Sequence, residues 1–147
     1  MSTESFVNLS NARRDDQRDI MRDIDEQGVC PFCPEHLTKF HKQPILRQGD
    51  HWLVTSNQWP YPYTSIHLLA ISTYHAEKMA DLQDGSFAEL QQHALWAEAT
   101  YRIAAGGLAM RFGDIGGNAA TVRHLHAHFI VPSPDRQPDE KVRFRIG

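Results

Sequence analysis

The chain has 147 residues, of which 41% are hydrophobic and 22% are charged, and these values are typical of one soluble globular domain over residues 1–147. A formal net charge of −3 gives no reason to expect a nucleic-acid partner. No apolar stretch approaches the ~18–20 residues that cross a bilayer, and the N-terminus has no basic segment followed by an apolar run. We therefore expect a cytoplasmic protein without a membrane partner.

The N-terminal part of the chain is expected to be helical. Residues 1–10 are predicted to be loosely ordered. Over residues 11–27 charged residues are dense, and the few apolar residues fall on one helical stripe. This pattern indicates an amphipathic helix that ends at Gly28. With the short proline-bounded knuckle that follows it, the helix makes up an N-terminal segment of residues 11–34.

The knuckle holds the two cysteines of the chain, Cys30 and Cys33, in the sequence Cys-Pro-Phe-Cys. In a reducing compartment this spacing favours a metal site or a redox pair over a structural disulfide. His36 and His41 lie nearby in the sequence and are candidate further ligands. A reduced cysteine pair without a metal is the alternative interpretation.

The middle of the chain alternates short strands with one long helix. The best-marked helix spans residues 86–105, where Ser86 and Glu89 form a capping box and Gly106 ends the helix. Strands are predicted at 45–46, 51–54, 66–71 and 108–112, a short helix at 75–82, and a possible edge strand at 142–146. The short loops favour hairpins. We therefore expect an α+β fold with about five antiparallel strands and two to three helices packed on one face.

Two further segments are candidates for ligand contact. Trp59 and Tyr61 in the aromatic loop 57–65, together with Trp52, are expected either to stack on a base or to pack in the interior. The tail 135–147 ends in a run of basic residues that lies near an anionic ligand or faces solvent. Those residues are Lys141, Arg143 and Arg145. His51 and His93 are predicted to be structural or surface residues.

The most informative stretch is residues 121–132, TVRHLHAHFIVP, in which His124, His126 and His128 occupy alternate positions. Alternate residues of a strand share a face, so this pattern predicts three imidazoles about 7 Å apart beside an apolar face. Three interpretations compete: a solvated polar face, a catalytic metal site, and nucleophilic catalysis in which one neutral imidazole attacks phosphorus.

The run from His124 to Ile130 resembles the motif of the histidine triad proteins, His-φ-His-φ-His-φ-φ with φ apolar. Upstream, His67 and His75 have the eight-residue spacing of the family's second histidine segment, although Ser72 replaces its usual proline and Ile66 its usual glycine. The segment Tyr-Pro-Tyr at 61–63 is similar to one in the dinucleoside-polyphosphate-cleaving branch. The resemblance covers residues 30–131 and implies a histidine triad-like fold.

The resemblance also implies roles for individual residues. His126 corresponds to the nucleophile that attacks the α-phosphorus and becomes a covalent nucleotidyl-histidine, His128 to the histidine at the scissile phosphate, and His67 to the residue that completes their polar network. Thr121 corresponds to a phosphate-binding hydroxyl. The glycine-rich turn 116–120 falls where backbone amides approach the phosphate, and the ribose ligand is less well defined. The expected substrate-binding residues are Thr121, Asn118, Ala119 and Asn57.

Zinc-bearing relatives imply a structural, four-coordinate Zn²⁺ site at the knuckle. Its ligands would be Cys30, Cys33, His75 and His124, which leaves His126 free for chemistry. His36 and His41 are the rival ligands. Relatives commonly form dimers, so a homodimer is expected.

The function expected from these residues is that of a nucleotide hydrolase or nucleotidyl transferase, and of a phosphorylase if phosphate replaces water. Its substrate would be a nucleoside phosphate derivative, either a dinucleoside polyphosphate or an AMP conjugate. Two alternatives are a metal-dependent hydrolase that uses all three triad histidines as ligands, and a nucleotide-binding regulator with little turnover.

Overall fold

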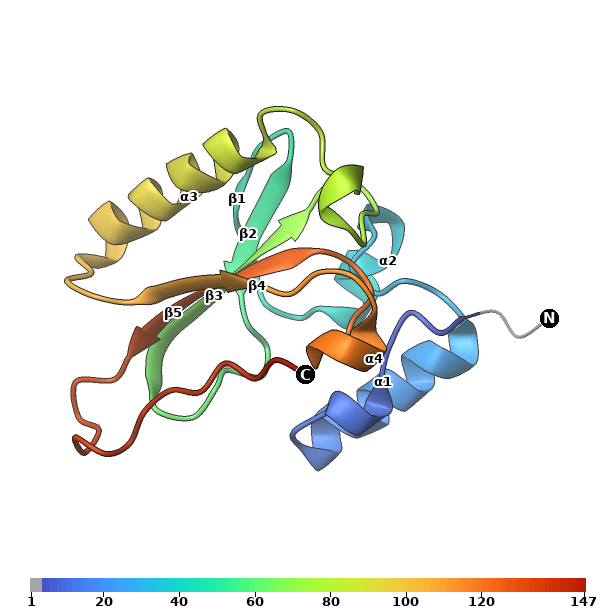
Figure 1. Ribbon diagram of the computed structural model, residues 1–147, viewed down its shortest axis with the longest axis horizontal. Helices are drawn as coiled ribbons and strands as arrows, with labels where there is room; N and C mark the ends of the chain where they lie inside the picture. Colours follow the sequence, from blue (N-terminus) through green and yellow to red (C-terminus); the bar gives the residue numbers. More distant parts are fainter. Residues whose placement is uncertain (1–3) are drawn as a thin grey trace.

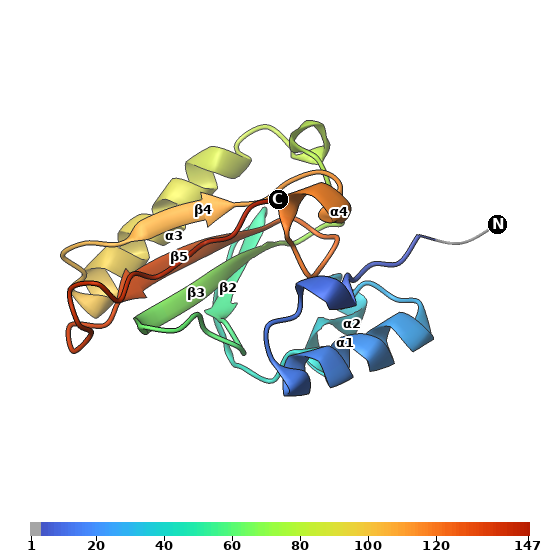
Figure 2. The same cartoon turned by 60° about the horizontal axis from the view of Figure 1, so that its bottom comes forward.

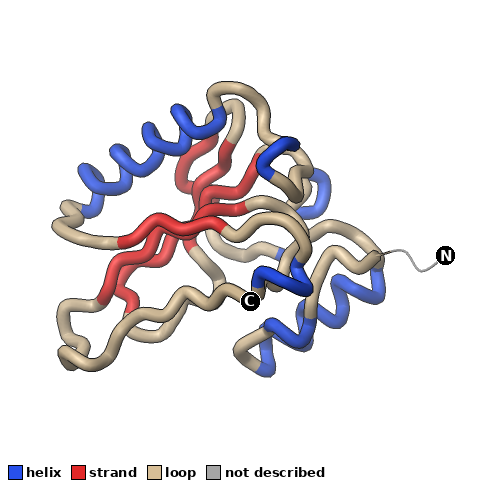
Figure 3. The backbone as a smooth tube through the Cα atoms, viewed as in Figure 1, coloured by secondary structure: helices blue, strands red, loops and turns tan. Residues whose placement is uncertain are grey.

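The structure is a computed structural model that describes residues 4–147. Its centre is one antiparallel sheet of five strands in the order β1-β2-β3-β5-β4 (Figures 1 and 3). The strands are β1 (Ile45–Gln48), β2 (Trp52–Ser56), β3 (Thr64–Ser72), β4 (Gly107–Met110) and β5 (His126–Pro132). The α+β fold with about five antiparallel strands is therefore confirmed.

Strands β3 and β5 form the middle of the sheet, and their register decides which side chains share a face. Ile71 is paired with His126 and Leu69 with His128, while His67 is paired with Ile130. Because side chains alternate along a strand, one face of the sheet carries the histidines. The other face carries the small and apolar residues between them.

The apolar face packs against α3 (Ser86–Tyr101). The core cluster between the sheet and α3 contains residues of both: Trp52, Val54, Leu68, Ala70 and Ala127 from the strands, and Leu90 and Ala97 from α3. The opposite face meets α2 (Pro34–Phe40) through Leu37, which packs on Leu69 and Ile71. Helices thus lie on both faces of the sheet, and the prediction that they cover one face was wrong.

The N-terminal segment lies at the end of the sheet next to the histidine face (Figure 2). It comprises a short 3₁₀ turn at Leu9–Asn11 and α1 (Asp15–Gln27), which ends as predicted at Gly28, a residue with φ of 65°. Val7 forms a β-bridge with Val122 and belongs to the cluster that buries Met21 and Ile24 of α1. Residues 1–3 of the segment predicted to be loosely ordered lie outside the described residues.

Helix α3 begins at Ser86 as predicted, but its N-terminal cap and its C-terminal end differ from the prediction. It ends at Tyr101, since Arg102 adopts a left-handed conformation (φ 52°). Its N-cap is Gly85, and no side chain caps it. The capping box was wrong because the Glu89 carboxylate instead accepts hydrogen bonds from the backbone amides of Asp50, His51 and Trp52. Glu89 therefore fastens α3 to the β1–β2 turn.

Three further elements differ from their predictions. Residues 75–82 contain a 3₁₀ turn at Met79–Asp81 and no longer helix. The glycine-rich turn folds into a short helix, α4 (Ile115–Asn118). No strand forms at 142–146 in the described chain, where the tail runs beside β4 and Arg145 accepts a hydrogen bond from Arg111 Nε through its carbonyl. Within residues 4–147, no helix combines the length and apolarity that a membrane span requires.

Candidate active site and metal centre

His126 begins β5 and is buried. Its Nδ1 lies 2.7 Å from the carbonyl oxygen of His124. A carbonyl can only accept a hydrogen bond, so Nδ1 carries the proton and Nε2 keeps a free lone pair. Burial lowers the pKa of His126 to about 4, and the ring is therefore neutral at pH 7. A neutral ring with a free lone pair on Nε2 is chemically able to act as a nucleophile.

His67 and His128 form a second hydrogen-bonded pair beside it. The backbone amide of Tyr61 donates to His67 Nδ1 at 3.1 Å, so the proton of His67 resides on Nε2. That Nε2–H donates to His128 Nδ1 at 2.8 Å, which places the proton of His128 on its own Nε2. Burial lowers the pKa of His67 to about 3, and it lowers the pKa of His128 as well.

The N–H group at His128 Nε2 lies beside a second hydrogen-bond donor, the guanidinium of Arg111. Arg111 Nη1 lies 3.4 Å from this nitrogen and also donates to the Tyr61 hydroxyl at 3.1 Å. Two donors that face the same position need an acceptor there. The arrangement therefore suits an anionic oxygen placed between His128 and Arg111.

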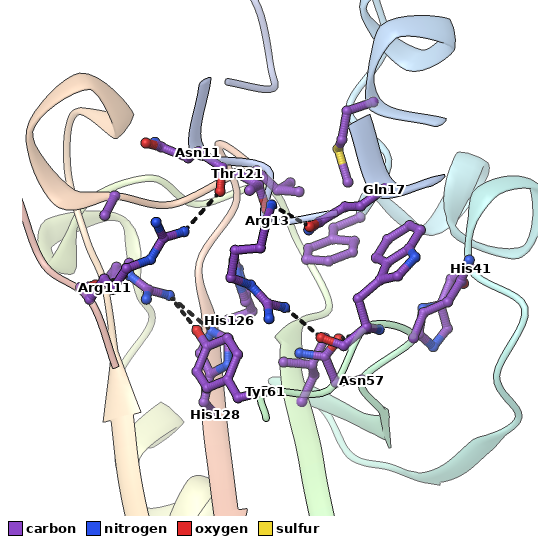
Figure 4. A pocket seen from close by; sticks show the side chains of 18 residues that line it. Asn11, Arg13, Gln17, His41, Asn57, Tyr61, Arg111, Thr121, His126 and His128 are labelled. Carbon is purple, nitrogen blue, oxygen red and sulfur yellow. Dashed lines mark hydrogen bonds between the residues drawn. The ribbon is translucent and has the colours of Figure 1, made fainter. Parts of the chain in front are cut away.

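His126 and His128 line a cavity of about 600 Å³, counted with its open mouth, and His67 lies behind His128 outside this lining. One part of its wall is apolar and consists of Met21, Phe32, Trp59, Leu69 and Val122. Another part carries three arginines: Arg13 from the N-terminal segment and Arg111 after β4, both labelled in Figure 4, and Arg145 from the C-terminal tail. The cavity thus offers an apolar surface and a cationic surface next to the neutral His126 ring.

The predicted substrate-binding residues divide into two groups. Asn57, Ala119 and Thr121 line the cavity. Asn118 does not, because its amide donates to the carbonyl of Phe112 at 3.0 Å and its Oδ1 accepts from the backbone N–H of Ala120 at 2.8 Å. Asn118 thus holds the loop, and the Ala120 amide is already used within it.

The aromatic residues that were candidates for base stacking also divide into two groups. Trp52 is fully buried in the core and donates its indole N–H to the Ser86 carbonyl at 2.7 Å, so it does not reach the cavity. Trp59 and Tyr61 line it. The Tyr61 ring stacks near His128 with 5.5 Å between centroids and 17° between planes. Within the core, His93 is buried and contacts Glu89 at 3.2 Å.

Sequence patterns did not reveal Arg13 or Arg111 as cavity residues. Arg13 lies in a charge-rich segment where many residues are ionised, and Arg111 stands alone after a short strand. Their positions depend on contacts between distant parts of the chain: Arg13 donates to the Trp59 carbonyl and lies 4.5 Å from the Tyr61 ring centroid. Arg145, in contrast, belongs to the basic tail that was a candidate for contact with an anion.

A separate cluster joins the knuckle to the end of the histidine strand. The ligand atoms of Cys30, Cys33, His75 and His124 all lie within 4.8 Å of one another. His124 Nδ1 is 3.4 Å from Cys30 Sγ and 3.7 Å from Cys33 Sγ, and His75 Nδ1 is 3.3 Å from Cys33 Sγ. Tetrahedral Zn²⁺ with ordinary Zn–S and Zn–N bonds separates such atoms by roughly 3.5 Å. The four predicted ligands therefore fit zinc.

The outer nitrogens of the two histidines support the same fit. His124 Nε2 donates to the Ser72 carbonyl at 2.8 Å, and His75 Nε2 faces the Glu77 carboxylate at 2.9 Å. Both contacts leave Nδ1 unprotonated and directed at the cysteines, as in metal-bound histidines. The rival ligand His41 is engaged elsewhere, with its Nε2 2.7 Å from Thr55 Oγ1.

The cysteines are free thiols in an environment that suppresses spontaneous ionisation. Burial, together with the neighbouring Cys30 thiol, raises the pKa of Cys33 to about 12. A redox pair requires an accessible thiolate, so this environment disfavours a redox role. A bound dication is what would convert the thiols to thiolates.

Comparison with known proteins agrees with this geometry. No protein-family model and no curated protein matches the chain, but many solved structures do. A HIT family hydrolase from Clostridium thermocellum matches with a TM-score of 0.56 and 20% identity over 75% of this chain and 95% of that one. A histidine triad nucleotide-binding protein from Candida albicans matches with a TM-score of 0.59 and 16% identity over 79% and 87%.

A third structure, a Zn-bound histidine triad family protein from Mycobacterium smegmatis, matches with a TM-score of 0.55 and 21% identity over 80% of this chain and 81% of that one. The chain has the histidine triad fold. The predicted resemblance is therefore confirmed at the level of the fold.

Within this fold the three triad histidines are not equivalent. Strand β5 begins at His126, so the prediction of one strand over residues 121–132 was wrong at its start. His124 precedes the strand, and its ring turns to Cys30 while its carbonyl holds His126. Three histidines directed at different partners do not converge on one metal ion, and this geometry argues against the metal-dependent hydrolase in which all three are ligands.

Proposed function

We propose that the protein is a histidine triad nucleotide hydrolase or nucleotidyl transferase, with His126 as the nucleophile at the α-phosphorus of a nucleoside phosphate derivative. The observation that carries this proposal is the hydrogen bond from His126 Nδ1 to the His124 carbonyl. It fixes the tautomer that exposes a lone pair on Nε2, in a ring whose pKa of about 4 keeps it neutral.

The reaction would proceed in two displacements. In the first, the Nε2 lone pair forms a bond to the α-phosphorus, and the bond from phosphorus to the leaving group breaks with its electron pair. The ring then carries a positive charge that the His124 carbonyl stabilises through Nδ1–H. In the second, a water oxygen attacks phosphorus, the N–P bond breaks to restore the lone pair, and the water's proton leaves to solvent.

The remaining predicted site residues take supporting roles. His128 would donate from Nε2 to an oxygen of the reacting phosphate, and His67 would hold the tautomer of His128. Thr121 and the backbone at Ala119, which has a φ of 66°, would contact the phosphate. Asn57 would contact the ribose. Asn118 would act as a positioning residue for this loop.

The apolar wall of the cavity supports a nucleoside as the other half of the substrate. Trp59, Phe32 and Met21 line this wall, and an aromatic base stacks favourably on such side chains. His41 and Gln58 add polar atoms to the same region. A base on this wall and a phosphate at His126 together account for both surfaces of the cavity.

A structural Zn²⁺ at the four-ligand cluster would stabilise the segments that contact His126. Held by Cys30, Cys33, His75 and His124, it would supply a fixed cross-link and, with no open coordination position, no reaction chemistry. Phe32, between the two cysteines, packs edge-on against the His126 ring with 5.0 Å between centroids. The cross-link would thus fix the position of the nucleophile.

A homodimer and a cytoplasmic location belong to the same proposal. Exposed apolar side chains on α3 and β4, among them Leu95 and Leu108, would form the contact between subunits. Free cysteines fit a reducing compartment.

The test is turnover by a His126→Ala protein. We expect its nucleotide release to fall at least about 1,000-fold, because removal of the nucleophile abolishes the covalent route. His36→Gln, a half-buried histidine outside the cavity, is the control and should retain full turnover. Wild-type turnover by His126→Ala would refute the assignment. Binding of nucleotide without turnover by the native protein would favour the regulatory alternative.

A further inference from the structure

Three arginines from distant parts of the sequence meet in one wall of the cavity. Arg13 belongs to the N-terminal segment and Arg111 follows β4 (Figure 4), and Arg145 belongs to the C-terminal tail. The residues that line the cavity within the described chain include no aspartate or glutamate. Burial is the largest cause that lowers the pKa of Arg13, and the nearby charges of Arg145 and Arg111 lower it further. Three like charges without a counter-charge repel one another.

The protein holds the three side chains in place with neutral groups. Arg13 donates to the Trp59 carbonyl, Arg111 Nε to the Arg145 carbonyl at 2.7 Å, and Arg145 Nη2 to the Asn11 carbonyl at 3.1 Å. The Arg111 guanidinium also lies 3.8 Å from the centroid of the Phe144 ring. None of the ion pairs found among residues 4–147 includes these arginines. The guanidinium groups are thus oriented while their positive charge is left unneutralised.

The arginines are also close to the groups of the proposed reaction. Arg111 Nη1 lies 3.4 Å from His128 Nε2, the donor assigned to the reacting phosphate. Each guanidinium has five N–H donors in a planar fork that matches phosphate oxygens, and the contacts above use only some of them. An anion bound by this wall would therefore lie next to the reacting phosphorus.

We propose that Arg13, Arg111 and Arg145 form a binding site for a second phosphoryl group beside the phosphorus that His126 attacks. This inference rests on the proposed function and narrows its substrate class: favoured substrates carry two or more linked phosphates. A substrate whose leaving group is a neutral amine or alcohol leaves the arginine site empty. A polyphosphate leaving group fills it, and the arginines stabilise the negative charge that the leaving oxygen gains.

The second phosphoryl group has two possible sources with the same chemistry. It is either part of the substrate, as in a dinucleoside polyphosphate, or free inorganic phosphate that enters after the leaving group departs. In the latter case a phosphate oxygen attacks the nucleotidyl-His126 phosphorus, the N–P bond breaks, and a nucleoside diphosphate forms in place of the monophosphate.

A binding experiment tests the site without relying on turnover. Inorganic pyrophosphate is titrated into the full-length protein by calorimetry. We expect Arg145→Gln to weaken binding on the order of 10-fold, since it removes charge-assisted hydrogen bonds. Arg145 is exposed, so its replacement should leave the fold intact. Arg143→Gln, two residues away and outside the cavity, removes the same charge from the same tail and should bind as the wild type does.

Kinetics with two substrates then assigns the role. With a dinucleoside polyphosphate, Arg145→Gln should lower kcat/KM on the order of 10-fold, and with an AMP amidate it should leave kcat/KM nearly unchanged. Equal losses on both substrates, or equal pyrophosphate binding by wild type, Arg145→Gln and Arg143→Gln, would overturn the proposal. Product analysis with and without added phosphate distinguishes the two sources. If no substrate turns over, the pyrophosphate titration still decides the anion site, so the two failures are distinguishable.

Discussion

Loss of one ligand of the proposed zinc site should both destabilise the fold and slow the reaction. Cys33 and His75 are 42 residues apart in the sequence. A cross-link that closes a loop of this length lowers the entropy of the unfolded chain by an amount worth about 4 kcal/mol. For a protein of this size, a loss of that magnitude lowers Tm by about 8–16 °C.

Activity should fall as well, because the cluster is in contact with His126, the proposed nucleophile. The His124 carbonyl fixes the His126 tautomer at 2.7 Å, and Phe32 of the knuckle packs on the His126 ring. The experiment compares Cys30→Ser with the wild type by metal analysis, calorimetry and turnover, with His36→Gln as the control. Full retention of zinc by Cys30→Ser, or an unchanged Tm after zinc is lost, would refute this account of the cluster.

Four further predictions follow from the geometry. Turnover should stay level as the pH falls from 8 to 5 and decline near the pKa of His126, about 4; a decline centred at pH 6.5 would contradict burial of a neutral ring. Because the pKa values of His126 and His67 are lowered in the folded protein, these histidines take up protons at higher pH in the unfolded chain than in the folded one. Their contribution to stability is therefore complete above pH 6.5 and is lost as the pH falls toward 4 and 3. Acid unfolding monitored by circular dichroism measures this loss. In denaturant titrations, Glu89→Gln should lower the free energy of unfolding by about 2–3 kcal/mol. Glu98 is exposed on the same helix, and Glu98→Gln should change this free energy little. Equal effects of the two substitutions would show that the hydrogen bonds from Glu89 to the β1–β2 turn contribute nothing. His67→Gln should lower kcat about 10–100-fold with zinc content unchanged, and an unaltered kcat would remove His67 from the network.

The sequence predicted the architecture where local patterns reflect the fold directly. Alternation around His126 and His128 predicted a strand with a histidine face, and β5 has one. The cysteine spacing, combined with the family resemblance, predicted a four-ligand cluster whose members do lie together. The strand prediction was correct because it depends on residues that are neighbours on one element. The cluster prediction was correct because it depends on a motif of several residues.

Prediction failed where a residue's partner lies far away in the sequence. Ser86 and Glu89 have the spacing of a capping box, yet the Glu89 carboxylate binds amides 37 to 39 residues away, and no local pattern encodes that choice. The alternation at 142–146 suggested an edge strand, whereas Phe144 packs on the Arg111 guanidinium and Arg145 lines the cavity. Arg13 and Arg111 belong to no sequence motif. Their positions at the cavity depend on the packing of the N-terminal segment and the C-terminal tail near the end of β4.

The central claim is that His126 Nε2 becomes bonded to phosphorus, and its most direct test is to trap that adduct. The protein is mixed briefly with a dinucleoside polyphosphate, quenched at alkaline pH where a phosphorus–nitrogen bond survives, digested, and analysed by mass spectrometry. We predict a nucleoside monophosphate attached to the peptide that contains His126, and none on the same peptide from His126→Ala. Rapid turnover with the label absent from that peptide, or present on another residue, would contradict the account.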